Sequence, residues 1–148
     1  MANQSQLQDV LNKQVANWTV MYTKLHHFHW YVKGHHFFSL HEKFEELYNE
    51  ADAALDEIAE RLLAIEGQPV STLKGSLELA SIKEAETKAP ADEMVKEVVS
   101  DFKQIIGELK EGISIADEAG DDVTADMFTA FQEKLEKHVW MLNAYLSK

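Results

Sequence analysis

The sequence predicts an all-α protein built as a four-helix bundle with one long crossover, and three observations lead to this fold class. Apolar residues recur at three- and four-residue steps over four long segments, which is the period of amphipathic helices. Glycine or proline marks the boundaries between these segments. The second and third segments are separated by a connection of about twenty residues, whereas neighbouring helices are usually joined by about 2–8 residues. Such a connection is long enough to travel the length of a bundle.

The first predicted helix covers residues 5–33, and Gly34 permits the left-handed turn that ends it. Gln14 occupies the one polar position in its apolar stripe, which is otherwise Leu7, Leu11, Trp18, Met21, Leu25, Phe28 and Val32. The second helix is expected to begin with Ser39 as its N-cap, because Glu42 completes a capping box three residues later. Gly67 is expected to end it. These two helices form an antiparallel hairpin.

The remainder of the chain supplies the crossover and a second pair of helices. A short helical patch at residues 73–80 is expected inside the crossover, between the second and third long helices. Pro90 marks the first turn of the third long helix, and Gly120 closes it. Asp121 or Asp122 then caps the fourth, whose apolar stripe continues to the C-terminal residues. The chain is therefore expected to be a single domain, residues 1–148.

Composition restricts the class of protein and its compartment. The 148 residues are 45% hydrophobic and 27% charged, which is ordinary for a globular domain, and no apolar run approaches the length of a membrane span. The chain contains no cysteine, so no disulfide framework is possible. Its first ten residues lack the pattern of a signal peptide. The expected location is the cytoplasm.

The charge balance indicates the kind of partner. The formal net charge is −12, from 26 acidic and 14 basic residues. Such a field attracts cations and repels nucleic acid and anionic membranes. A less specific explanation is that the acidic excess only supports solubility.

The stretch from His29 to Glu60 carries the strongest chemical signal, because it places nitrogen and oxygen ligands at helical intervals. His41 and Glu45 are four residues apart, and so are Asp56 and Glu60. Imidazole and carboxylate ligands without sulfur favour iron or another hard or oxidisable divalent cation over a soft metal. We interpret these five residues as a metal site, with zinc or another divalent metal as a possible substitute for iron.

Helix geometry shows that one chain cannot complete this site. Residues 41, 45, 56 and 60 share one face of the second helix, but His41 and Asp56 are fifteen positions apart, which spans about 22 Å, whereas metal ligands lie within about 2–2.6 Å of the ion. Two antiparallel copies about a twofold axis would bring His41 and Glu45 of one chain against Asp56 and Glu60 of the other. His29 should lie across the hairpin from His41. The sequence contains no Glu-x-x-His, which argues against a di-iron centre within one chain.

Simpler explanations exist for each of these residues. Histidines at helix ends are often solvated, and acidic pairs such as Glu45–Glu46 and Asp56–Glu57 usually form a wet face. Four other histidines fit no partner spacing and are expected on the surface or in turns: His26, His27, His35 and His36. His138 borders an apolar stripe and is expected to be a hydrogen-bonded core or interface residue.

With these residues in place, the chain resembles the Dps family of mini-ferritins over nearly its whole length. The resemblance is carried by His29-Trp30-Tyr31-Val32-Lys33-Gly34-His35-x-Phe-Phe-x-Leu-His41-Glu42-x-x-Glu45 and by Asp56-Glu57-Ile58-Ala59-Glu60-Arg61. It implies a ferritin-like bundle that assembles into a hollow dodecamer. It also implies that the protein oxidises ferrous iron, preferentially with hydrogen peroxide, stores the ferric mineral and protects against oxidative stress.

The resemblance also assigns roles by position. His29, His41, Glu45, Asp56 and Glu60 would be the ferroxidase ligands at a twofold interface, although the family often has Asp where this chain has Glu45. Trp30 would be an electron donor that limits radical escape, or else would only pack beside the site.

A second acidic cluster lies around the turn between the third and fourth long helices. Asp121 and Asp122 have a sufficient explanation as helix caps, but Asp117 lies at a helix C-terminus, where the dipole disfavours anions. In the family this segment lines threefold pores, so Asp117, Asp121 and Asp126 are pore candidates. Glu46, Glu50 and Glu57 are candidates for mineral nucleation.

Two other functions remain open at this point. A nucleoid DNA-binding protein would protect DNA by covering it, but residues 1–12 contain no Lys or Arg, and no basic segment follows the last helical stripe. We therefore expect little or no direct DNA binding. A structural helical assembly with incidental zinc binding is the third hypothesis.

Overall fold

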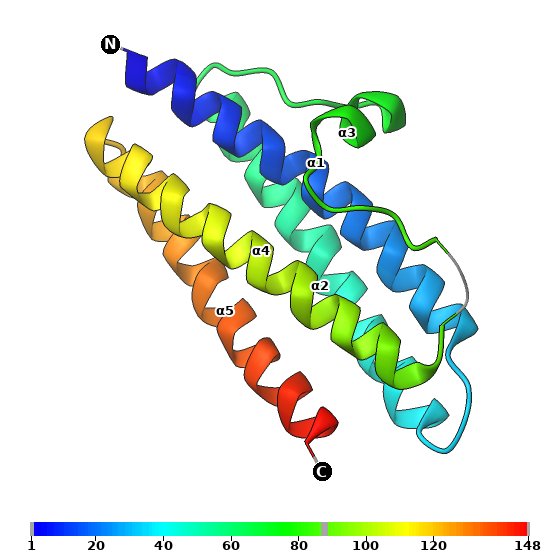
Figure 1. Cartoon of the computed structure of the whole chain (residues 1–148). Helices are drawn as coiled ribbons and strands as arrows, with labels where there is room; N and C mark the ends of the chain where they lie inside the picture. The colour runs from blue at the N-terminus through cyan, green and yellow to red at the C-terminus, as the bar shows by residue number, and fades with distance from the viewer. Residues whose placement is uncertain (1, 87–88, 148) are drawn as a thin grey trace.

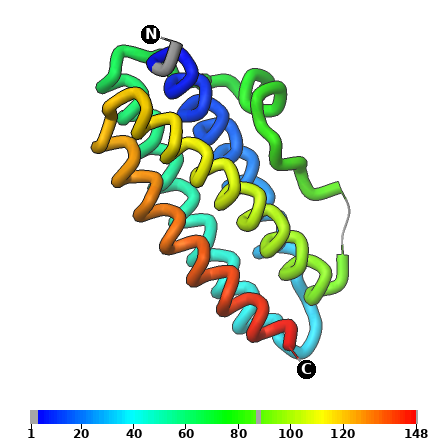
Figure 2. The backbone as a smooth tube through the Cα atoms, turned by 60° about the vertical axis from the view of Figure 1, so that its left-hand side comes forward, coloured from blue at the N-terminus to red at the C-terminus, as the bar shows by residue number. Residues whose placement is uncertain are grey.

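The computed structural model describes residues 2–86 and 89–147, and this part of the chain contains five helices and no strand. They are α1 (Ala2–Tyr31), α2 (Phe37–Ala64), α3 (Leu73–Leu79), α4 (Ala91–Glu118) and α5 (Asp122–Leu146). The four long helices form two antiparallel pairs, α1 with α2 and α4 with α5, that lie side by side (Figures 1 and 2). The short helix α3 packs against α1. The predicted all-α bundle with one crossover helix is confirmed.

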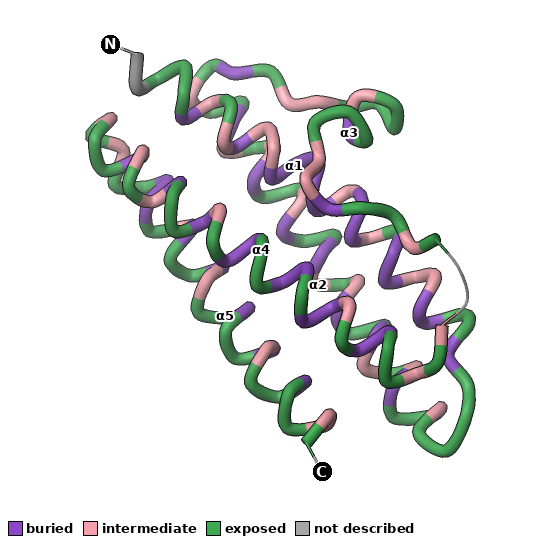
Figure 3. Tube along the Cα trace, viewed as in Figure 1, coloured by how far each residue is buried: buried purple, intermediate pink, exposed green. Residues whose placement is uncertain are grey.

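The core lies along the axis between the two helix pairs (Figure 3). Each long helix contributes one phenylalanine with an exposed fraction of 1% or less: Phe28, Phe44, Phe102 and Phe128. Phe28 and Phe44 pack across the α1–α2 hairpin with ring centroids 5.6 Å apart. Gln14, the polar member of the α1 stripe, is fully buried. The periodicity therefore identified the buried faces correctly.

The predicted start of α2 is wrong, and the structure adds detail to its predicted end. Ser39 is not the N-cap of α2. His36 occupies that position without a side-chain cap, and the Ser39 hydroxyl donates to the His36 carbonyl. At the other end of α2, Glu66 rather than Gly67 adopts the left-handed backbone, with φ of 70°. The Gly67 amide donates to the Leu62 carbonyl, as in a Schellman motif. A Cβ at Gly67 would collide with the buried Leu62 side chain, so close approach explains this glycine.

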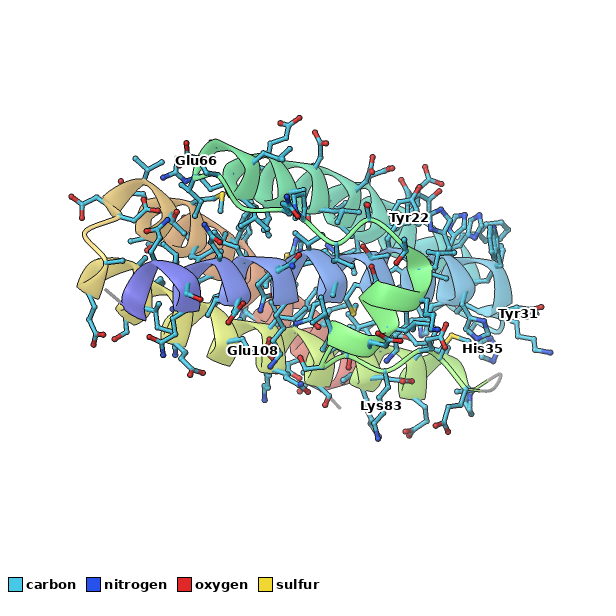
Figure 4. The ribbon with its side chains drawn as sticks, turned by 90° about the horizontal axis from the view of Figure 1, so that it is seen from above. Tyr22, Tyr31, His35, Glu66, Lys83 and Glu108 are labelled. Atoms are coloured by element: carbon cyan, nitrogen blue, oxygen red, sulfur yellow. The ribbon has the colours of Figure 1, made fainter. Side chains whose placement is uncertain are left out.

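The crossover is held along α1 by polar side chains that the apolar pattern does not reveal. Asn12 Oδ1 accepts a hydrogen bond from the Val70 amide, and Asn17 Oδ1 accepts one from the Ser81 amide, both at 2.8 Å. Lys24 Nζ donates to the Lys83 carbonyl at 2.8 Å. Lys83 and Glu108 are labelled in Figure 4, where the crossover runs beside α1.

Glu108 joins the crossover to the middle of the bundle. Its Oε1 accepts hydrogen bonds from Gln14 Nε2 at 2.8 Å and from Asn17 Nδ2 at 2.9 Å, and its Oε2 accepts one from the Ser81 hydroxyl. These bonds satisfy the buried Asn17 amide together with its bond from Ser81, and they satisfy the Nε2 group of Gln14, whose Oε1 has no partner among the described residues. They also explain why Gln14 is tolerated within an apolar stripe.

Two glycines of α4 provide a matched test of this packing. A Cβ at Gly112 would lie 2.6 Å from the Phe128 ring, whereas nothing lies within 4 Å of a Cβ at Gly107. We expect Gly112→Ala to lower the free energy of unfolding by about 1–3 kcal/mol through overpacking. Gly107→Ala should raise it by up to about 1 kcal/mol through helix propensity. Chemical denaturation of both variants measures the difference, and equal effects would contradict the close α4–α5 packing.

Candidate metal centre

The closed end of the α1–α2 hairpin brings His29 and His41 together. His29 lies in the last turn of α1 and His41 near the start of α2, with Gly34 at φ of 111° in the turn between them. The two imidazole rings stack with centroids 3.7 Å apart and an interplanar angle of 12°. The prediction that His29 lies across from His41 is confirmed. Figure 4 shows this end of the bundle at Tyr31 and His35, far from Glu66 at the other end.

Two reciprocal hydrogen bonds fix the orientation of both rings. His29 Nδ1 lies 2.7 Å from the His41 carbonyl oxygen, and His41 Nδ1 lies 2.7 Å from the His29 carbonyl oxygen. A carbonyl oxygen only accepts, so each Nδ1 carries the proton and donates it. In the neutral imidazole, each Nε2 then keeps its lone pair. A backbone carbonyl behind Nδ1 is also the usual support of a metal-binding histidine.

The carboxylate of Glu45 extends this pair on the next turn of α2. Its Oε1 lies 3.8 Å from His29 Nε2. The Glu45 side chain is 53% exposed, whereas the His29 side chain is 9% exposed. The site therefore opens to the surface on the Glu45 side.

Asp56 and Glu60 lie further along α2, and both are exposed. The rise of a helix separates Asp56 from His41 by about 22 Å. Within the described ranges 2–86 and 89–147, no three His, Asp or Glu side chains come together as a metal site. The five candidate residues thus lie in two separate groups within one chain, one at the closed end of the α1–α2 hairpin and one further along α2.

Aromatic side chains surround the histidine pair. Phe37 stacks on His41 with centroids 4.9 Å apart, and Tyr48 meets His29 edge to face at 5.3 Å. His26 stacks on Tyr48 at 3.6 Å. The Trp30 ring, 67% exposed, lies 5.3 Å from the His26 ring.

His26 and Tyr48 were missed as neighbours of the site. His26 is one helical turn before Trp30, and Tyr48 is two turns after His41, which is the only signal that the sequence offered. Burial, the negative charge of Glu45 and the neighbouring Tyr22 raise the pKa of the Tyr48 phenol. The phenol therefore keeps its proton at neutral pH.

The three pore candidates differ in their surroundings. Asp117 and Asp126 are exposed near the turn between α4 and α5. Asp121 is the N-cap of α5 and accepts hydrogen bonds from the Thr124 amide at 3.0 Å and from Arg61 at 2.8 Å. Burial alone would raise the pKa of Asp121, but the bonds from Thr124 and the charge of Arg61 outweigh it and lower that pKa.

The nucleation candidates on α2 are also unequal. Glu46 and Glu57 are exposed, and Glu46 pairs with Lys43 at 3.2 Å. Glu50 instead accepts a hydrogen bond from Nε2 of the buried His138 on α5. This bond lowers the pKa of Glu50 more than burial raises it. His138 has the expected core position, although its Nδ1 finds no partner among the described residues.

None of the helices within residues 2–86 and 89–147 combines the length and the apolar character that a membrane span requires.

Comparison with known proteins places this geometry in context. The sequence model of the ferritin-like domain family matches residues 8–148 of this chain. The chain is 59% identical over 141 residues to general stress protein 20U of Bacillus subtilis, covering 95% of this chain and 97% of that protein. It is 59% identical over 137 residues to the DNA protection during starvation protein of Brevibacillus brevis, covering 93% and 92%. The crystal structure of a Dps protein from Bacillus brevis superposes with a TM-score of 0.98 at 56% identity, covering 99% of each chain.

The environment of Asp121 generates a stability prediction. We expect Asp121→Ala to lower the free energy of unfolding by about 0.5–2 kcal/mol, the usual cost of losing an N-cap. The folded-state pKa of Asp121 is depressed, so its contribution is complete above its ordinary value of 3.8 and disappears as the pH falls through the lower folded value. Denaturation across a pH series measures this convergence of variant and parent.

Asp126→Ala is the matched control, because Asp126 is exposed on the same helix without a capping bond. It should change stability by no more than about 0.5 kcal/mol. Equal destabilisation by both substitutions would contradict a specific structural role for Asp121.

Proposed function

Because the chain belongs to the Dps family of ferritin-like proteins, we propose that it oxidises ferrous iron and stores the ferric product inside a hollow homo-oligomer. The expected assembly is a dodecamer in the cytoplasm, and the biological outcome is protection against oxidative stress. Iron is the substrate and the cargo. Hydrogen peroxide is the expected oxidant, with molecular oxygen as the alternative.

The observation that carries this proposal is the reciprocal pair of hydrogen bonds between His29 and His41. Both Nδ1 protons are committed to carbonyl oxygens, so two Nε2 lone pairs are directed away from the backbone and toward a ligand. Glu45 adds an oxygen donor beside them. Imidazole with carboxylate is a donor set that suits ferrous iron, and zinc binds to the same groups.

The ligand set is completed by a second subunit. Asp56 and Glu60 are exposed on the same helix, too far along it to reach His41 of their own chain. An antiparallel twofold pairing of α2 helices supplies Asp56 and Glu60 of one chain to His29, His41 and Glu45 of the other. Each pair of subunits then holds two equivalent sites, each with room for up to two iron ions.

The other proposed roles concern the entry of iron, its oxidation and the nucleation of the mineral. Asp117, Asp121 and Asp126 provide an acidic route for ferrous iron, with Asp121 also holding the start of α5. At the site, two ferrous ions supply the two electrons that reduce one hydrogen peroxide to water. Trp30 serves as an electron donor that limits radical escape. Glu46 and Glu57 are the exposed candidates for mineral nucleation, whereas Glu50 is engaged by His138.

Subunit mixing tests the shared site. Assemblies of His29→Ala chains alone, or of Asp56→Ala chains alone, should oxidise iron at least tenfold more slowly than the parent, because every site loses one ligand. Coassembly of the two variants should restore activity, since each mixed pair contains one site with both halves intact. Anaerobic ferrous loading followed by peroxide, with ferric absorbance as the readout, measures the rate. Unchanged rates in the separate variants would reject the assigned ligands.

A control separates sharing from general effects of coassembly. Mixing His29→Ala chains with His41→Ala chains places both lesions on the same half of the site, so no intact site can form. This mixture should remain inactive. Recovery in both mixtures would mean that coassembly restores activity by a general effect, and recovery in neither would mean that each chain holds its own centre.

Direct DNA binding is the alternative function, and the name of the Brevibacillus brevis relative refers to DNA protection. With a net charge of −12 per chain, phosphate contacts must overcome repulsion. We expect no shift of DNA mobility in a gel at low salt without iron. A salt-sensitive shift under those conditions would favour protection by physical coverage of DNA. Retention of zinc without any iron oxidation would instead favour a structural assembly.

A further inference from the structure

Tyr48 is the aromatic ring that connects the ligand histidines to the rest of the aromatic cluster. Its ring lies 5.3 Å from the His29 ring in an edge-to-face contact. On its other side it stacks on His26 at 3.6 Å with an interplanar angle of 17°, and Tyr22 lies 6.1 Å away. Tyr22 is labelled in Figure 4, on the face of α1 that meets α2. The rings therefore form a continuous path away from His29.

Trp30 stands at the outer end of this path, although it follows His29 directly in the sequence. Consecutive residues of a helix point about 100° apart, and the Trp30 ring contacts His26 at 5.3 Å. The order of the rings is thus His29, Tyr48, His26 and Trp30. Within one chain, an electron moving from Trp30 to a metal on His29 through ring contacts passes through Tyr48.

We propose that Tyr48 is the electron donor nearest to the iron site and that it supplies the missing electron when a site holds only one ferrous ion. The inference rests on the proposed ferroxidase function. One ferrous ion gives a single electron, whereas reduction of hydrogen peroxide to two waters takes two electrons and two protons. Tyr48 supplies the second electron with its phenol hydrogen, and one proton comes from solvent. The products are one ferric ion, two water molecules and a neutral tyrosyl radical.

The surroundings of Tyr48 suit this role better than those of Trp30. The Tyr48 side chain is half-buried between α1 and α2, whereas Trp30 is 67% exposed. A radical on Tyr48 is shielded by the His26 and His29 rings on either side. Stepwise transfer through His26 to Trp30 then moves the oxidising equivalent outward, away from the metal ligands.

The experiment adds peroxide to the assembled protein carrying less than one ferrous ion per site and follows radicals by freeze-quench electron paramagnetic resonance. The parent should give a tyrosyl signal. Tyr48→Phe, which keeps the ring and removes the phenol, should lose that signal and release several-fold more hydroxyl radical to a spin trap. Trp30→Phe should still form the tyrosyl signal, because Tyr48 rather than Trp30 contacts His29.

Tyr145→Phe is the matched control, since it makes the same chemical change on α5, where the ring contacts His36 instead of His29. It should keep both the parental signal and the parental level of trapped radical. An unchanged tyrosyl signal in Tyr48→Phe would overturn the proposal. Absence of rapid ferric formation in the parent at full iron loading would instead reject the ferroxidase function, so the two failures are distinguishable.

Discussion

Two hydrogen bonds across the closed end of the α1–α2 hairpin support both the fold and the candidate metal centre. Each of His29 and His41 donates from Nδ1 to the backbone carbonyl of the other. The bonds join the end of α1 to the start of α2, and they select the tautomer that leaves Nε2 unprotonated. The contact that closes the hairpin therefore also fixes the orientation of both candidate ligand rings.

The rigidity of α2 sets the second constraint. A straight helix keeps His41 and Asp56 about 22 Å apart whatever the side-chain rotamers are. Under the proposed function, a complete site exists only where two subunits meet, so iron is oxidised only by assembled protein. Such coupling is useful for a storage protein, because the ferric product then forms next to the shell that encloses it. Within one chain, Asp56 and Glu60 are both exposed.

The acidic residues differ in their surroundings, because only some of them accept hydrogen bonds from other side chains. Asp121 is held by Thr124 and Arg61, whereas Asp117 and Asp126 are exposed. Glu50 is engaged by His138, whereas Glu57 is exposed. Carboxylates that accept such hydrogen bonds stabilise the bundle. The exposed carboxylates are the better candidates for binding iron. The number of acidic residues in the sequence, 26, does not predict which of them are hydrogen-bonded and which are exposed.

The sequence by itself determined the four long helices, the crossover helix and the juxtaposition of His29 with His41, because helical periodicity and turn chemistry act within short segments. It also determined that His41 and Asp56 cannot serve one ion in one chain. Only the tertiary structure decided that Glu108 accepts hydrogen bonds from Gln14 and Asn17, and that the Tyr48 ring rather than the Trp30 ring contacts the His29 ring. The physical reason is that these contacts join residues on different elements, and they depend on how each helix is rotated about its axis against its neighbour. No short window of sequence specifies that rotation; the packing of the whole core does.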